Sequence, residues 1–345
     1  MIRFECDYAE GAHPLILKRL METNMMQTPG YGNDDFSQKA RESIKKVCKS
    51  DACDVHFVSG GTQANLLVIS SVLKPYQGVI SADTGHINTH ETGAIEATGH
   101  KVLTIKSDDG KIRASQVEET CQDHLNDPNH EHVPAPGMVY ISHPTENGTT
   151  YSKDELSELS AVCKKYNLPL FMDGARLGYA LAASDNTLNM DDIAKLCDIF
   201  YIGGTKVGAM FGEAIVIVKD ELKKDFRYNI KQRGAMLAKG RMLGIQFDVL
   251  FEDGLYFEIS KNAVALAMQI KEACAKKGFK FRYESTTNQQ FPILPNALIT
   301  ELSKKYAFYP WEKGDENGTP VRFCTSWATS AENVKQLVDD INNFA

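Results

Sequence analysis

Alternating strand and helix patterns between residues 55 and 218 constrain the fold of this chain more than any other feature. Short apolar runs, such as residues 55–58 and 138–142, alternate with longer segments that have helical periodicity. This alternation predicts a mostly parallel β-sheet with helices on both faces, because parallel strands need crossover connections, which are usually helices. We therefore expect an α/β fold.

The pattern changes beyond residue 220. It becomes helical between residues 221 and 278, with one long helix predicted over 252–277. Strand and helix patterns then mix again, with apolar runs at 279–283 and 321–325 and a hairpin turn at 315–318. A capping box from Thr329 to Glu332 is expected to open the last helix. We predict a large domain, residues 1–250 with an N-terminal arm, and a small C-terminal α/β domain, residues 251–345.

The composition is that of an ordinary globular protein and argues against several functions. The 345 residues carry a formal net charge of −7, and no basic cluster with interleaved aromatic residues is present, which argues against nucleic-acid binding. No apolar run approaches ~18 residues, so no membrane span is expected. The N-terminus lacks the apolar core of a signal peptide. The eight cysteines form no CxxC pair, which indicates reduced thiols in a cytoplasmic protein.

Polar and glycine-rich segments follow five of the predicted strands at the point where each strand ends. These segments are residues 59–62, 83–86, 146–147, 173–176 and 203–206. Ligands in open α/β sheets bind beyond the C-terminal ends of the strands. Each segment is ambiguous alone, but together they predict one pocket.

Lys206 lies in the last of these segments, in a tight turn between two apolar runs. Its small neighbours, Gly203 and Gly204 among them, allow a flat molecule to approach the backbone closely. A partly desolvated amine in such a place becomes a nucleophile. The turn therefore favours a lysine that forms a Schiff base with pyridoxal phosphate, although a surface lysine in a glycine-rich loop fits the same residues.

Residues at the other strand ends match what pyridoxal phosphate needs from a protein. Asp173 suits the carboxylate beside the pyridine nitrogen, although a helix cap or turn residue is the alternative. Gly60, Gly61 and Thr62 precede a predicted helix, whose first backbone amides can bind phosphate. His86 can stack on the ring.

His86 also raises the question of a metal site, because His90 lies four residues later and Glu91 is next to it. Histidines at this spacing share a helix face and can bind zinc. No third ligand occurs at a usual spacing, and Glu91 is not in the HExxH position. We therefore expect no metal.

Two arginines are candidates for binding the carboxylate of an amino-acid substrate, because arginine grips carboxylates in bidentate fashion. They are Arg176 and Arg322. Arg322 interrupts an otherwise apolar strand pattern, and a surface-facing strand position is the alternative explanation for it.

These residues together resemble the threonine aldolase branch of the β-eliminating lyases, pyridoxal phosphate enzymes with the aspartate aminotransferase fold, or fold type I. The matching motifs are Tyr31-Gly32, Gly60-Gly61-Thr62-Gln-Ala-Asn65, His86-Ile87 with Glu91, Asp173-Gly-Ala-Arg176, Thr205-Lys206-Val-Gly208 and Arg322. Their order and spacing match over nearly the whole chain. The Asp-Gly-Ala-Arg motif followed by the lysine is the most specific part.

The resemblance implies a role for each residue. The implied cofactor-binding residues are Gly60, Gly61, Thr62, His86, Asp173, Arg176, Thr205 and Lys206, of which His86, Asp173 and Lys206 also act in catalysis. The implied substrate-binding residues are Tyr31, Glu146, Arg176 and Arg322. The family often has a histidine where this chain has Glu146, and a serine where it has Cys6; a carboxylate at position 146 can still act as a base.

The implied reaction is retro-aldol cleavage of a β-hydroxy amino acid, of the L-threonine or L-allo-threonine type, to glycine and an aldehyde. A β-elimination lyase acting on another amino acid is the first alternative. A catalytically silent protein of the same fold and, more distantly, a metal hydrolase built on His86, His90 and Glu91 are the others. Family members are usually tetramers of tight dimers, so we expect a homodimer or homotetramer with shared active sites, in which residues 231–241 could reach a neighbour's phosphate.

Overall fold

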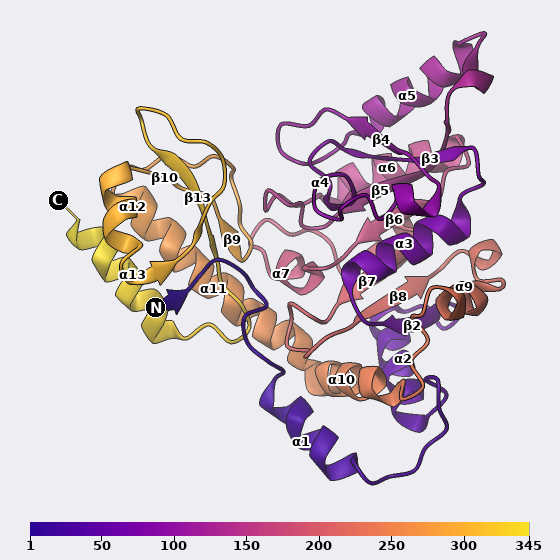
Figure 1. Cartoon of the computed structure of the whole chain (residues 1–345), viewed down its shortest axis with the longest axis horizontal. Coiled ribbons are helices and arrows are strands. Elements are labelled where there is room, and N and C mark those ends of the chain that lie inside the picture. Colours follow the sequence, from indigo (N-terminus) through magenta and orange to yellow (C-terminus); the bar gives the residue numbers. More distant parts are fainter. Residues whose placement is uncertain (345) are drawn as a thin grey trace.

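A seven-stranded sheet lies at the centre of the larger part of the molecule (Figure 1). The computed structural model describes residues 1–344. The strands, in their order across the sheet, are β2 (Asp54–Val58), β8 (Glu213–Ile217), β7 (Ile199–Gly203), β6 (Leu170–Asp173), β5 (Ala135–Ser142), β3 (Gln77–Ala82) and β4 (Val102–Ile105). All neighbours are parallel except the two pairs that β8 makes with β2 and β7. The predicted mostly parallel sheet is confirmed.

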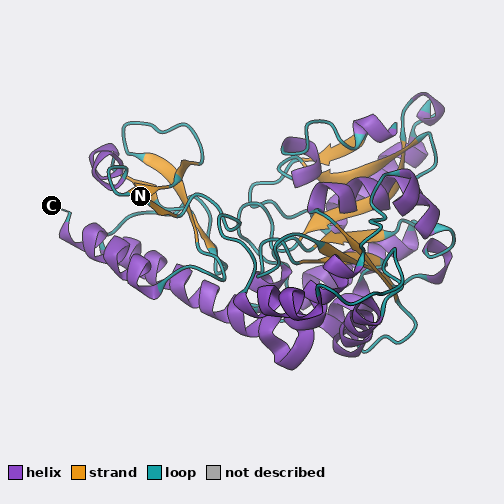
Figure 2. Cartoon of the chain, turned by 60° about the horizontal axis from the view of Figure 1, so that its bottom comes forward, coloured by secondary structure: helices purple, strands orange, loops and turns teal. Residues whose placement is uncertain are grey.

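Helices cover both faces of this sheet, as predicted (Figure 2). One face packs against α2 (Asp35–Cys48), α5 (Ala114–Asn126), α6 (Lys153–Lys165), α7 (Leu177–Leu181), α8 (Met190–Leu196) and α10 (Arg241–Phe251). The other face packs against α3 (Gly61–Val72), α4 (His86–Thr89) and α9 (Phe226–Gln232). Within residues 1–344, no helix combines the length and the apolar composition that crossing a membrane requires.

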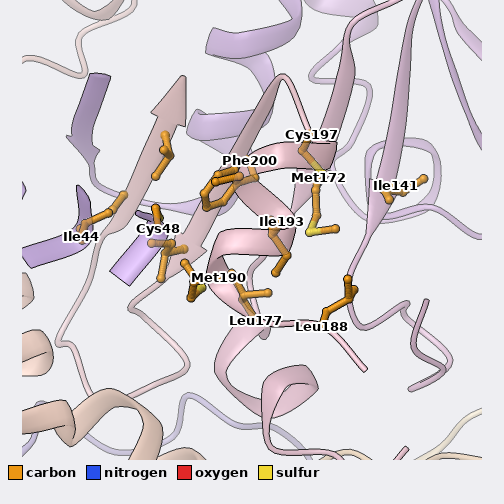
Figure 3. Packing of buried hydrophobic residues seen from close by; sticks show 14 of the residues in the cluster. Ile44, Cys48, Ile141, Met172, Leu177, Leu188, Met190, Ile193, Cys197 and Phe200 are labelled. Carbon is orange, nitrogen blue, oxygen red and sulfur yellow. The ribbon is translucent and has the colours of Figure 1, made fainter. Parts of the chain in front are cut away.

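The two faces have separate cores because successive strand residues point to opposite sides. In β7, Phe200 and Ile202 join the first core, and Ile199 and Tyr201 join the second. Figure 3 shows part of the first core, where Phe200 lies in the same cluster as Ile193 of α8. This alternation leaves Tyr201 on the side of the sheet that α3 covers.

The C-terminal part has its own small core and sheets. Strand β13 (Thr319–Cys324) pairs antiparallel with β9 (Gln289–Gln290), β10 (Ile293–Leu294) and β12 (Tyr309–Pro310), and helices α12 (Asn296–Leu302) and α13 (Ala331–Asn343) pack beside it. The predicted turn at 315–318 connects β12 to β13, and Asp315 forms a bridge with Gly318. The small C-terminal α/β unit is thus present.

A single helix, α11 (Leu255–Lys276), connects the two parts. Figure 1 shows it running from beside α10 to the C-terminal part. Its first half contributes Ile259 and Ala263 to the core of the large sheet, and its second half contributes Leu266 and Ile270 to the C-terminal core. The two parts are therefore packed against one continuous element.

The N-terminal arm contacts both parts of the molecule. Strand β1 (Ile2–Arg3) forms a two-stranded sheet with β11 (Tyr306–Ala307) of the C-terminal part. The predicted division of the chain into domains at residue 250 stays a prediction. Helix α1 (Pro14–Thr23) follows and lies against α10.

Three expectations about individual elements are wrong in detail. Residues 279–283 form no strand, and Phe281 makes only an isolated bridge to Pro292. The long helix begins at Leu255, because Asp253 has a left-handed φ of 51° and breaks the helix before it. The last helix is capped by Ser330, whose hydroxyl accepts a hydrogen bond from the Asn333 amide, and not by Thr329.

Candidate active site

A cavity of about 300 Å³ lies at the edge of the sheet where the parallel strands end. Each of the five predicted strand-end segments contributes at least one residue to the lining of this cavity. Strand β8 runs in the opposite direction, so its first residue, Glu213, reaches the same edge. The predicted convergence on one pocket is observed.

Asp173 ends strand β6 and is the buried anion of this cavity. Its Oδ2 accepts hydrogen bonds from the Tyr140 hydroxyl at 2.6 Å and the Asn65 amide at 3.1 Å. Its Oδ1 accepts from the Tyr201 hydroxyl at 2.5 Å and the Ala175 amide at 3.0 Å. Burial opposes the charge, but nearby His86 and these hydrogen bonds hold the pKa of Asp173 below its ordinary value. The carboxyl group is therefore ionised at neutral pH.

Asn65 connects Asp173 to a second buried carboxylate, Glu91. The Asn65 amide nitrogen also donates to Glu91 Oε1 at 2.7 Å, and the same oxygen lies 2.8 Å from His86 Nδ1. Although burial opposes it, the hydrogen bond to Glu91, together with the charge of Asp173, raises the pKa of His86. One chain of contacts thus orients His86 and Asp173 together.

The first turn of α3 also lines the cavity. The helix begins at Gly61, and its N-cap, Gly60, provides no side-chain hydrogen bond. A Cβ atom at Gly60 would meet nothing within 4 Å, so the backbone there is open to a ligand. The amide groups of a first helical turn lack partners within the helix, and they attract anions such as phosphate.

Lys206 lies in the turn between β7 and β8, with its side chain partly buried at the cavity. The Tyr179 hydroxyl donates to the Lys206 carbonyl oxygen at 2.5 Å and fixes the backbone. Burial, with the positive charge of Arg176, lowers the pKa of the Lys206 amine. A lowered pKa increases the fraction of neutral, nucleophilic amine.

Arg176 lines the cavity as predicted, but it is already paired. Its Nε and Nη2 donate to the two oxygens of Asp7 at 2.6 and 3.0 Å. Asp7 is fully buried and also accepts from the Asn288 amide at 2.9 Å. Burial opposes the charge of Asp7, but Arg176 lowers its pKa to about 2. Asp7 therefore occupies the Nε/Nη2 side of the Arg176 guanidinium, and the remaining N–H groups on Nη1 and Nη2 stay free for a substrate carboxylate.

Arg322 and Glu146 line an adjoining cavity of about 390 Å³, which also borders His86, Arg176 and Lys206. The Arg322 guanidinium lies over the rings of Trp311, at 4.9 Å from the centroid, and Tyr309, at 5.9 Å. Its position on β13 brings the C-terminal part to the rim of the pocket. The second cavity extends the first toward this arginine.

Glu146 lies at the junction of the two cavities. Its Oε1 accepts from the Ser142 hydroxyl at 2.7 Å and the His86 amide at 3.0 Å. Burial raises the pKa of Glu146. The predicted Glu146 and Arg322 thus line one cavity together with Lys206.

Tyr31 does not join them. It is 46% exposed and lies in a different, small cavity lined by Arg41, His56 and Arg227. Its backbone amide donates to the Ala238 carbonyl, which holds the turn against the loop before α10. The predicted contact of Tyr31 with the substrate is therefore not made within one chain.

Several site residues were missed by the sequence interpretation. They are Asp7, Tyr8, Tyr140, Ser142, Tyr201 and Glu213. Asn65 and Glu91 were part of the recognised motifs, but no role followed from them. Tyr140, Ser142 and Tyr201 could have been found from one signal in the sequence. Each carries a hydroxyl group, lies near the end of a strand that reaches the pocket, and points to the side of the sheet that α3 covers.

The arrangement fits pyridoxal phosphate. The uncapped helix start suits the phosphate, the ionised Asp173 suits a protonated pyridine nitrogen, and the Lys206 amine of lowered pKa suits the aldehyde. His86 lines the same cavity and is available to stack on the ring. No group of three or more His, Cys, Asp or Glu side chains suited to a metal ion occurs within residues 1–344.

Replacing Glu91 tests the contacts that orient His86. Glu91→Gln should lower the pKa of His86 by about one pH unit, because the negative charge that stabilises the protonated ring is lost. An NMR titration of the His86 ring measures this value. Glu96→Gln, at an exposed position nearby, serves as the control and should leave the pKa unchanged. An unaltered His86 pKa in Glu91→Gln would contradict the assignment.

Comparisons with known proteins agree with this site. A model of the β-eliminating lyase family matches residues 14–295. A low specificity L-threonine aldolase of a Pseudomonas species is 32% identical over 343 residues, which cover 98% of this chain and 96% of that protein.

Solved structures agree as well. The Leishmania major threonine aldolase superposes with a TM-score of 0.96 and 45% identity, covering 99% of this chain and 98% of that one. A Thermus thermophilus aspartate aminotransferase shares the fold, with a TM-score of 0.70 over 99% of this chain and 91% of that one, at 14% identity. The predicted fold is thus confirmed, and the chain belongs to the β-eliminating lyase family, as a relative of its threonine aldolases.

Proposed function

We propose that this protein is a pyridoxal phosphate-dependent lyase that cleaves a β-hydroxy amino acid, of the L-threonine or L-allo-threonine type, to glycine and an aldehyde by retro-aldol chemistry. The observation that carries the proposal is that Lys206, Asp173 and His86 line one cavity together with the start of α3, where no side chain caps the helix. The similarity to proteins named threonine aldolases, at 32% and 45% identity over nearly the whole chain, supports this reaction.

The residues of the larger cavity would hold the cofactor. When bound, pyridoxal phosphate supplies the sink for the electrons released as the Cα–Cβ bond breaks. Asp173, kept ionised by its four donors, would keep the ring nitrogen protonated. The backbone of Gly60, Gly61 and Thr62 would hold the phosphate, and Lys206 would provide the amine.

Arg322 is suited to the substrate carboxylate. Its Nη2 donates to the Glu5 carbonyl at 2.9 Å, whereas its Nε is buried and has no hydrogen-bond partner within residues 1–344. An unsatisfied buried donor on a charged group is costly, and a carboxylate in the adjoining cavity would satisfy it. Arg176, which lines the same cavity, would add the N–H groups that Asp7 does not use.

Glu146 is suited to act as the base that removes the proton of the substrate's β-hydroxyl. Both of its hydrogen bonds go to Oε1, which leaves Oε2 without a donor within residues 1–344. A carboxylate of raised pKa is a stronger base than an ordinary glutamate. Because the base must be ionised, activity should fall as the pH drops through this raised pKa.

We also propose that the protein is a homodimer or homotetramer with shared active sites and that it is cytoplasmic. Tyr31 and the basic stretch 231–241 do not line either of the two active-site cavities of their own chain, and the ammonium of Lys231 lies 5.0 Å from the Tyr31 ring centroid. These residues are thus available to a neighbouring copy. The eight cysteines are free thiols, which supports a reducing compartment.

A product assay tests the reaction. With pyridoxal phosphate and L-threonine or L-allo-threonine, the wild-type protein should form glycine and acetaldehyde, and Lys206→Ala should form neither. Lys224→Ala removes an exposed lysine and should keep full activity. A keto acid and ammonia would instead indicate a β-elimination lyase, the alternative suggested by the name of the family. No product from any β-hydroxy amino acid would reject the aldolase.

Replacing Arg322 tests the substrate site. Arg322→Ala should raise KM about tenfold or more, because a charge-assisted hydrogen bond to the substrate carboxylate is lost. The value of kcat should change less, since the reacting bond lies elsewhere. Arg322→Lys should recover only part of the affinity, because lysine cannot form the bidentate contact. Steady-state kinetics with an unchanged KM would contradict this role.

A further inference from the structure

Glu213 is a buried carboxyl group in the active-site cavity that has no part in the chemistry described so far. It is the first residue of β8, is only 3% exposed and lines the same cavity as Lys206. Because β8 runs antiparallel to β7, Glu213 pairs with Gly203, the last residue of β7. The carboxyl group therefore lies beside the turn that carries the lysine.

The hydrogen bonds of Glu213 go to the two residues that precede Lys206. Oε2 accepts from the Gly204 amide at 3.0 Å, and Oε1 accepts from the Thr205 hydroxyl at 2.8 Å. Thr205 Oγ1 in turn accepts from the Gly212 amide at 3.0 Å, so its own proton is committed to Glu213. These contacts cross-link the turn and fix the direction in which Lys206 leaves it.

Both donors to Glu213 are neutral, so its charge depends on the cations around the cavity. Burial raises the pKa of Glu213 to about 8, and burial lowers the pKa of Lys206. The charge of each of these two groups therefore affects the protonation of the other. The other titratable groups that face this pair are Asp7, His86, Asp173, Arg176, Tyr201 and Tyr256.

We propose that Glu213 is a positioning residue for Lys206: its carboxyl group fixes the turn that carries the lysine, and its charge sets the fraction of the lysine amine that is neutral. The inference deepens the proposed function and rests on it, because an amine must be neutral to react with an aldehyde.

Replacing Glu213 by glutamine tests the proposal on the cofactor-free protein. Glu213→Gln keeps the size of the side chain but cannot become negative. The Lys206 amine should then titrate about one pH unit lower than in the wild type, because no ionised carboxylate stabilises the ammonium form. Competitive acetylation across a pH series, with mass spectrometry of the peptide that contains Lys206, measures this midpoint.

Two matched variants control the measurement. Glu221→Gln removes an exposed carboxylate that follows strand β8, and it should not move the midpoint of the Lys206 titration. Glu213→Asp keeps the charge and should hold the midpoint closer to that of the wild type than Glu213→Gln does. An unchanged midpoint in a folded Glu213→Gln variant would overturn the proposal, because a purely structural carboxyl group gives that result.

The reciprocal variant covers the case in which Glu213→Gln does not fold. In the wild type, the positive charge of Lys206 lowers the pKa of Glu213, which is about 8. Lys206→Met removes this charge, so the pKa of Glu213 should rise above that value. A ¹³C NMR titration of the glutamate carboxyl carbons measures it. A carboxyl titration that does not move would overturn the proposal. If the wild type forms glycine but neither the Lys206 midpoint nor the Glu213 pKa shifts in these variants, only the role of Glu213 is rejected. If both values shift but no glycine forms, the proposed aldolase reaction is rejected and the role of Glu213 is kept.

Discussion

The pocket depends on how one buried negative charge, that of Asp173, is stabilised. Moving a carboxylate out of water is costly unless hydrogen bonds and opposite charges replace the solvent. Tyr140, Tyr201, Asn65 and the backbone supply four donors, which arrive from three strands or their ends and from the first turns of α3. Satisfying this one group therefore ties together the elements that must meet at the edge of the sheet. The same contacts leave an ionised carboxylate facing the cavity, which is the state that a protonated pyridine nitrogen requires.

Residues far apart in the sequence meet because of the sheet topology and close backbone contacts. A Cβ atom at Gly203 would collide with the backbone of Ala175, so glycine at this position allows the end of β7 to lie against the turn after Asp173. Lys206 and Asp173 consequently face one cavity although their positions are 33 apart in the sequence. Helix α11 also brings distant residues together, because it packs in both cores. Arg322 of the C-terminal part therefore lies at the rim of the active-site pocket.

The sheet, the helices on its two faces and the residues at the centre of the site could be predicted from the sequence. Strand-helix alternation and the binding rule for strand ends predicted the sheet and the meeting of Lys206, Asp173, His86 and the Gly60 turn. Tyr140 and Tyr201 escaped prediction because a tyrosine within an apolar strand is equally expected in a core. Glu213 escaped because it begins an antiparallel strand, to which the rule for parallel strand ends does not apply. The partner of Arg176, Asp7, comes from an irregular N-terminal segment with no periodicity to interpret.

The measurement that tests the central claim most directly is the mass of the peptide that contains Lys206 after the protein has been incubated with pyridoxal phosphate, reduced with borohydride and digested. Borohydride makes a bond between an amine and the cofactor's aldehyde permanent. The account predicts a pyridoxyl phosphate adduct on Lys206 and on no other lysine at stoichiometric yield. An unmodified Lys206 peptide, or an adduct that is spread over surface lysines, would contradict it.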